Sequence, residues 1–96
     1  MLLHILNRSP ETSRVHRQTL AAMGPEDRLL LIEDAVQGAL PGLDGHFEGL
    51  DGRLYALEED LVARGLAAHC REGVRVVDLE GFVILTEQAR KTVSWY

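Results

Sequence analysis

The sequence predicts a small α/β protein in which a mostly parallel sheet of about five strands carries helices on both faces. Short apolar runs of strand length alternate along the chain with stretches of helical spacing. Such alternation is typical of parallel strands joined by crossover helices. Hydrophobic residues make up 46% of the chain and are mainly aliphatic, which suits packed layers of this kind. With 96 residues and neither a linker nor an internal repeat, we expect a single domain over residues 1–96.

The first strand is predicted at Leu2–Leu6 and the helix that follows it at Thr12–Met23. His4 lies inside this strand, where we expect a hydrogen-bonded imidazole in the core. Ser9–Glu11 is a typical helix start, because it offers a capping hydroxyl, a proline for the first turn and then an acid. Gly24–Pro25 indicates where the helix ends.

The second strand, Arg28–Ile32, is continuously hydrophobic after its arginine, as strands buried on both faces tend to be. One or two helical turns are expected over Asp34–Leu40. The glycine-rich stretch Pro41–Gly52 then predicts a loop with a short turn. A third strand at Arg53–Leu57 leads directly into a helix over Glu58–Leu66.

A fourth strand is predicted at Val74–Val77, a helix at Leu79–Ala89 and a fifth strand at Thr92–Trp95. Ligand sites in parallel sheets lie beyond the carboxyl ends of the strands. In this chain those positions are Asn7–Pro10, Glu33–Asp34 and Glu58–Asp60.

Three acids, Glu58, Glu59 and Asp60, crowd the start of the helix after the third strand. They could form a catalytic or metal site, or they could be an ordinary acidic first turn that the helix macrodipole stabilises. Asp60 and Arg64 are four residues apart and can pair on the helix surface. No metal-ligand motif accompanies the acids, and the histidines share no tight spacing. We therefore favour the structural interpretation and expect no metal and no cofactor.

The single cysteine, Cys70, lies between His69 and Arg71. These neighbours could lower its pKa and favour the reactive thiolate. Adjacent side chains usually point apart, however, so a half-exposed loop thiol without a special role is the preferred interpretation. One cysteine cannot form an internal disulfide, which fits a reducing compartment. No signal peptide or membrane-spanning run is recognisable, and we expect a soluble, cytoplasmic protein.

The turn Asn7–Pro10 could hold an anion through backbone N–H groups and Arg8. It lacks the glycines of a phosphate loop, and helix capping accounts for Ser9 and Pro10. The net charge of −5 argues against direct binding of nucleic acid, because phosphates must be neutralised by Lys and Arg. No nucleophile elbow, phosphate loop or dinucleotide fingerprint is present, so we do not expect an independent enzyme.

The chain contains four segments in a recognisable order: LHILNRSP, LLLIEDAVQGAL, YALEEDLVARGL and VVDLEGFVILT. Together with the tryptophan-containing tail SWY, they resemble the TusB/DsrH family of sulfur-relay subunits over nearly the whole chain. The resemblance implies a fold of the DsrEFH type. It also implies two related partner subunits, one TusC/DsrF-like and one TusD/DsrE-like, in a hetero-hexamer that passes sulfur as a cysteine persulfide.

In such a complex the principal persulfide cysteine belongs to the TusD/DsrE-like subunit. DsrH-type members carry a further cysteine in the first helix, at about the position of Thr19 here. A threonine hydroxyl cannot hold a persulfide, so the chain looks closer to the TusB branch. Ala35 stands where the family often has glycine, which argues against a positive φ at this position. The loops of the family motifs contribute Asn7, Arg8, Ser9, Asp34, Glu59 and Asp60.

Three interpretations follow. The leading one is a non-catalytic subunit of a sulfur-relay complex that supports 2-thiolation of the tRNA wobble uridine, or alternatively a DsrH-type subunit in dissimilatory sulfur oxidation. Its partners would be the two related subunits and, indirectly, tRNA or a sulfur-carrier protein, with no membrane contact. It predicts an apolar surface for those subunits. The second interpretation is a thiol-active sulfur carrier that uses Cys70. The third is a module that binds an anion at the Asn7–Pro10 turn.

Overall fold

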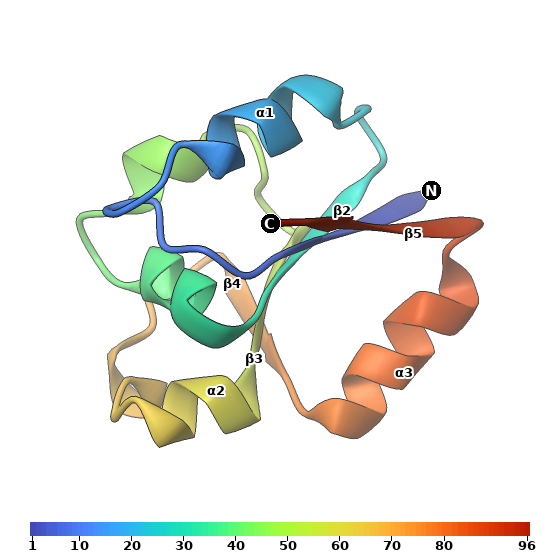
Figure 1. The fold of residues 1–96 in the computed structure, drawn as a ribbon. Helices are drawn as coiled ribbons and strands as arrows, with labels where there is room; N and C mark the ends of the chain where they lie inside the picture. Colours follow the sequence, from blue (N-terminus) through green and yellow to red (C-terminus); the bar gives the residue numbers. More distant parts are fainter.

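All five strands lie in one parallel sheet in the computed structural model, which describes residues 1–96 (Figure 1). Every neighbouring pair of strands is parallel, so the predicted α/β class and parallel sheet are confirmed. The spatial order is β4-β3-β2-β1-β5. The strands are β1 (Leu2–Leu6), β2 (Arg28–Leu31), β3 (Leu54–Leu57), β4 (Val74–Val77) and β5 (Lys91–Trp95).

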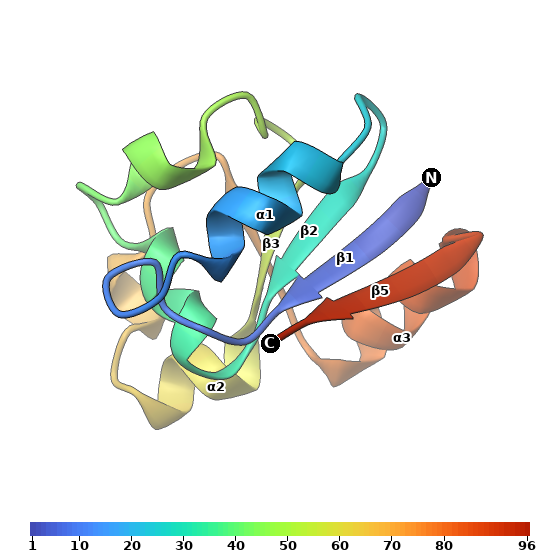
Figure 2. The same cartoon turned by 45° about the horizontal axis from the view of Figure 1, so that its top comes forward.

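Helices cover both faces of the sheet, as the sequence predicts. Helix α3 covers one face, and the other helices lie on the opposite face (Figures 1 and 2). None of them combines the length and the hydrophobicity that crossing a bilayer would need. The helices are α1 (Val15–Ala22), α2 (Glu58–Ala63) and α3 (Leu79–Gln88), with short 3-10 helices η1 (Glu33–Ala39), η2 (Asp44–Phe47) and η3 (Ala67–His69).

Strand β2 supplies core residues to both faces because successive side chains along a strand point in opposite directions. Leu29 and Leu31 join the larger cluster of eleven buried residues, together with Phe47 of η2 and Leu61 of α2. Leu30 joins a smaller cluster of five beneath α3. All three leucines are fully buried, which confirms the interpretation of this hydrophobic run as a central strand.

The first helix begins later than the sequence predicts. Instead of starting at Thr12, α1 starts at Val15, and Ser9 does not cap it. The Ser9 hydroxyl accepts a hydrogen bond from the N–H of Glu11 at 3.2 Å, and its carbonyl accepts those of Thr12 and Ser13. Ser9 therefore closes a separate turn, because such local side-chain bonds offer the backbone an alternative to helix.

The segment after β2 forms the expected helical turns, but as the tight 3-10 helix η1. Its backbone enters through Glu33, the one non-glycine residue with a positive φ (50°). Ala35 has no positive φ, as its identity predicts. Gly38 lets η1 approach η2 closely, because a Cβ atom built there would lie 2.5 Å from Cε2 of Phe47.

Replacing Gly38 by alanine should destabilise the fold by about 1–3 kcal/mol, because the new methyl group overpacks against a core ring. Urea unfolding followed by circular dichroism measures this change. Gly45→Ala is the matched control, since nothing lies within 4 Å of a Cβ atom at that position. Equal stability of the two variants would contradict the close approach of η1 and η2.

Candidate functional site

The carboxyl ends of β2 and β3 are joined by a cluster of charged side chains. Asp60 in the first turn of α2 accepts the N–H of Glu33 through Oδ2 at 2.7 Å. Arg64, one turn later, donates to Oδ1 of Asp34 through Nε and Nη2, both at 3.1 Å. Its Nη1 lies 3.8 Å from Oδ1 of Asp60, which confirms the ion pair that their spacing predicts. The cluster therefore holds the loop after β2 against α2.

Glu59 extends these contacts to the next unit of the fold. Its Oε2 accepts the N–H of Leu79 at 3.2 Å, at the start of α3, and both Glu58 and Glu59 are exposed. No three His, Cys, Asp or Glu side chains of the chain come together as potential metal ligands. The carboxylates of Glu59 and Asp60 thus serve as acceptors for backbone N–H groups of neighbouring segments.

The turn Asn7–Pro10 lies apart from this cluster. No hydrogen bond or ion pair joins Asn7, Arg8 or Ser9 to Asp34, Glu59 or Asp60. Arg8 is exposed, Ser9 is buried, and Oδ1 of Asn7 is buried without a hydrogen-bond partner. The residues of the family motifs therefore form two groups: Asp34, Glu59 and Asp60 together, and Asn7, Arg8 and Ser9 separately.

Thr19 is fully buried on the side of α1 that faces the sheet. Its hydroxyl donates to the carbonyl of Val15 at 3.1 Å, one turn earlier in the helix. The position that the resemblance equates with a sulfur-carrying cysteine is thus a closed core position in this chain.

Cys70 is half-buried directly after η3, and its thiol donates a long hydrogen bond of 3.9 Å to the carbonyl of Leu66. Burial raises the pKa of Cys70, and the adjacent Arg71 lowers it by less. The guanidinium of Arg71 donates instead to the carbonyls of Gly38 and Leu40. The neighbours therefore do not activate the thiol, and at neutral pH it stays protonated and weakly nucleophilic.

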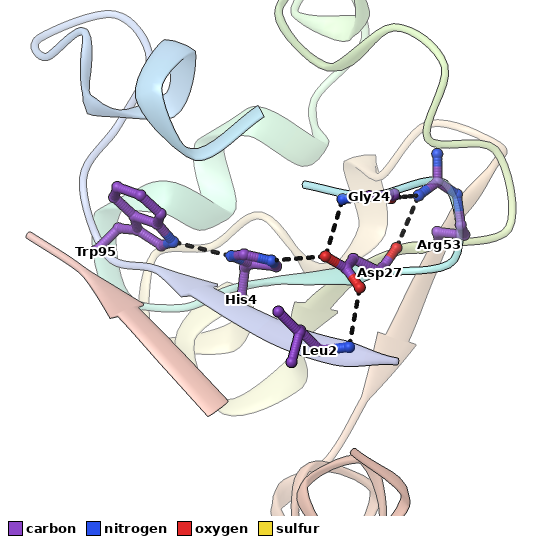
Figure 3. Close-up of polar contacts among 6 residues, drawn as sticks. All are labelled: Leu2, His4, Gly24, Asp27, Arg53 and Trp95. Carbon is purple, nitrogen blue, oxygen red and sulfur yellow. Dashed lines mark hydrogen bonds and ion pairs between the residues drawn. The ribbon is translucent and has the colours of Figure 1, made fainter. Parts of the chain in front are cut away.

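A buried polar network that the sequence analysis missed has Asp27 at its centre (Figure 3). Oδ1 of Asp27 accepts the N–H of Leu2 at 2.9 Å. Oδ2 accepts the N–H of Gly24 at 2.9 Å and lies 3.1 Å from Nε2 of His4. Arg53 donates to the carbonyls of Gly24 and Asp27 at 3.1 and 2.8 Å. The network joins the start of β1, the loop before β2 and the residue that precedes β3.

His4 connects this network to the end of the chain. The indole Nε1–H of Trp95 donates to Nδ1 of His4 at 3.0 Å, and the two rings stack with centroids 6.2 Å apart. An indole can only donate, so Nδ1 of His4 is the acceptor. The proton of the ring is then on Nε2, and this N–H donates a hydrogen bond to Oδ2 of Asp27. His4 is 2% exposed, which confirms the expected core imidazole. The Trp95–His4–Asp27 series therefore links the end of β5 to the loop before β2, with His4 and Asp27 buried and Trp95 half-buried.

The hydrogen bonds keep Asp27 ionised. Burial alone raises the pKa of Asp27, but the N–H groups of Gly24 and Leu2 and the imidazole of His4 outweigh this effect and lower it to about 2. The sequence around Asp27, just before a predicted strand, does not indicate which groups would bind its carboxylate. Only the fold brings these donors to it.

Two hollows open on the surface, and neither is lined by Cys70. One, of about 230 Å³, lies near the amino ends of β3 and β4 and has four carboxylates beside Arg71. The other, of about 290 Å³, lies between the start of α1 and η2 and has no hydrophobic residue in its lining.

Exposed apolar side chains are found on α2, on the edge strand β4 and on α3. Val76 of β4 is 42% exposed, and Leu79 and Val83 of α3 are 56% and 54% exposed. These three residues with Val62 and Ile84 are five of the six large hydrophobic side chains that are exposed, and they are named the β4-side surface below. Such a concentration on neighbouring elements is typical of an interaction surface.

Comparisons with known proteins give one consistent result. A family model described as "DsrH like protein" matches residues 8–92. Protein TusB of Serratia proteamaculans (strain 568) is 39% identical over 100 residues, which cover 98% of this chain and 100% of that protein. Protein TusB of Escherichia coli (strain K12) is 34% identical over 97 residues, with coverage of 98% and 100%. The crystal structure of the ychN protein from E. coli has the same fold, with a TM-score of 0.80, 21% identity and 97% coverage of both chains.

The Asp27 network should make stability depend on pH in the acid range. The folded-state pKa of Asp27 is about 2, below the ordinary value of 3.8, so the stabilisation is complete above pH 3.8 and is lost as the pH falls towards 2. By linkage the effect is on the order of 2 kcal/mol. Asp27→Asn should lower the free energy of unfolding at pH 7 by a similar amount and flatten its decline between these pH values.

Urea unfolding at a series of pH values measures both effects. Asp51→Asn is the matched control, because Asp51 is exposed and accepts no hydrogen bond, and it should behave as the parent chain does. Parallel acid curves for the parent chain and Asp27→Asn would show that Asp27 does not have this role.

Proposed function

The chain belongs to the DsrH-like family, and from this premise we propose that it is a non-catalytic subunit of a sulfur-relay complex that supports 2-thiolation of the wobble uridine in tRNA. The similarity to proteins named TusB over almost the whole chain favours this branch over the dissimilatory one. The proposed partners are a TusC/DsrF-like and a TusD/DsrE-like subunit in the cytoplasm.

The observation that carries the subunit role is the β4-side surface. Strand β4 is an edge of the sheet, and the apolar side chains beside it, Leu79 and Val83 among them, are more than half exposed in the isolated chain. Interfaces of permanent complexes are more hydrophobic than ordinary protein surface, because association removes that area from water. We infer that a partner subunit covers this surface in the complex.

The side chains of Thr19 and Cys70 support the role of a scaffold rather than that of a sulfur carrier. Thr19 has a buried hydroxyl that is bonded within its own helix, so this position offers no sulfur atom. The thiol of Cys70 is half-buried and its pKa is raised, which disfavours the thiolate that sulfur exchange requires. In the proposed complex, the persulfide is therefore carried by a partner.

The net charge of −5 supports an indirect relation to tRNA. An acidic subunit repels the phosphate backbone at long range. We propose that contact with tRNA, or with the protein that passes sulfur onward to it, is made elsewhere in the assembly.

Val83→Asp should abolish assembly while the isolated chain stays folded, because Val83 is 54% exposed but would become buried at the interface. An unpaired charge buried there should reduce recovery of the partners by at least about tenfold. The tagged chain is purified from its native cells and the partners are identified by mass spectrometry. Ala21→Asp is the matched control, since it places the same charge on an exposed position of α1.

Recovery of two small related α/β proteins with the parent chain and with Ala21→Asp, but not with Val83→Asp, would support the proposal. Failure to recover such partners with the parent chain would rule out the subunit role. Equal recovery with both variants would show that the partners bind elsewhere than on the β4-side surface.

Cys70→Ser should leave sulfur transfer by the assembled complex unchanged, because a thiol with a raised pKa is not expected to exchange sulfur. Transfer is followed with radiolabelled sulfur, from a cysteine donor to the complex and onward to its acceptor. Replacement of the reactive cysteine of the TusD/DsrE-like partner by serine is the positive control and should stop transfer. Loss of transfer in Cys70→Ser would instead identify this chain as a sulfur carrier.

A further inference from the structure

The polar hollow beside α1 is lined by groups that carry or can carry positive charge. Arg14 and Arg17 flank the first turn of α1, His16 lies between them, and His46 reaches the hollow from η2. Glu11 is the only carboxylate in the lining. The hollow therefore brings two arginines and two imidazoles together against a single acid.

These arginines have no partner within the chain, unlike those that build the fold. Arg53, Arg64 and Arg71 donate to carbonyl or carboxylate oxygens. Arg14 and Arg17 are exposed and take part in no ion pair. The segment from Arg8 to Arg17 holds three arginines and one glutamate, in a chain whose net charge is −5. Basic charge is thus concentrated where nothing in the fold uses it.

His16 gives a second and independent indication. It is 4% exposed, and its Nδ1 is buried without a hydrogen-bond partner, which is unusual for a polar atom inside a protein. The His46 ring lies edge-on to it with centroids 5.1 Å apart. Burial lowers the pKa of His16, the charge on His46 lowers it further, the nearby backbone of Ser13 raises it, and Arg17 lowers it again. Unbalanced positive charge therefore acts on a buried imidazole.

We propose that this hollow binds a phosphate-type dianion, either inorganic phosphate or the phosphate group of a monoester, between Arg14, Arg17 and the two histidines. Guanidinium groups match the oxygens of such an anion in geometry as well as in charge. The amino end of α1 adds the positive end of a helix dipole on the same side. The anion balances the positive charge of Arg14 and Arg17, which no other group of the chain pairs.

The site is distinct from the features described above. Of the Asn7–Pro10 turn only Pro10 lines the hollow, and Arg8, the side chain through which that turn could hold an anion, does not. None of the β4-side surface residues lines it either. The inference therefore does not depend on the sulfur-relay proposal, and either one can fail without the other.

The test is a titration of the full chain with inorganic phosphate, followed by the NMR signals of the histidine rings at constant ionic strength. We expect saturable shifts at His16 and His46. The titration midpoint of His16 should also move to higher pH when phosphate is bound, because the anion favours the protonated imidazole. The other charged or titratable groups that line the hollow are Glu11, Arg14, Arg17 and His46.

Arg14→Gln and Arg17→Gln should each weaken phosphate binding by about tenfold, the loss expected for one charge-assisted hydrogen bond. Arg8→Gln and Arg90→Gln remove the same charge from exposed positions outside the hollow and should have little effect. A parallel titration with adenosine monophosphate distinguishes the ligands. If adenosine monophosphate binds more tightly than phosphate, the ligand is a monoester. If the two bind equally, the ligand is the free anion. Both results support the site.

Three results would overturn the inference. The first is the absence of saturable shifts at both histidines. The second is an equal loss of affinity in Arg8→Gln or Arg90→Gln, which would mean adventitious attraction to any basic group. The third is a response of the two imidazoles to zinc chloride but not to phosphate, which would make the hollow a metal site.

Discussion

The arrangement of the amino ends of the strands depends on the hydrogen bonds that the carboxylate of Asp27 accepts. A buried carboxylate is costly unless donors surround it, and here the donors come from three different parts of the chain. The Leu2 N–H fixes the start of β1, the Gly24 N–H fixes the turn before β2, and His4 leads to Trp95 at the end of β5. One charge thereby sets the position of the central strands relative to an edge strand that forms from the last residues of the chain.

A second group of polar contacts holds the opposite end of the sheet. Asp60 and Arg64 tie the loop after β2 to α2, and Glu59 ties α2 to α3. These contacts within the fold occupy the carboxyl ends of β2 and β3, part of the edge where a parallel sheet usually carries its ligand. The surfaces proposed above for other molecules are the β4-side surface and the basic hollow beside α1.

Local patterns were sufficient to predict the sheet, because four of the five strands are short apolar runs and β2 is apolar on both faces. The pattern is weakest at β5, which contains Lys91, Thr92 and Ser94. The predicted start of α1 was wrong because the Ser9 hydroxyl accepts the N–H of Glu11 in a separate turn instead of capping the helix. The sequence does not show which of these two hydrogen-bonding patterns forms. The Asp27 network could not be predicted, since His4 is 23 residues from Asp27 and 91 from Trp95. The pKa of Cys70 likewise depends more on burial, which the sequence does not show, than on the adjacent Arg71.

The raised pKa of Cys70 has a further meaning in the proposed complex. Sulfur moves between proteins by attack of a thiolate on a sulfur–sulfur bond, so any accessible thiolate near a persulfide is a competing acceptor. A scaffold that surrounds a partner's persulfide must therefore either lack a thiol or keep it protonated. This chain has no thiol at Thr19, whose hydroxyl donates to a carbonyl within α1. At Cys70 it has a thiol whose burial disfavours the thiolate. A subunit with these properties can shape the path of the sulfur without diverting it.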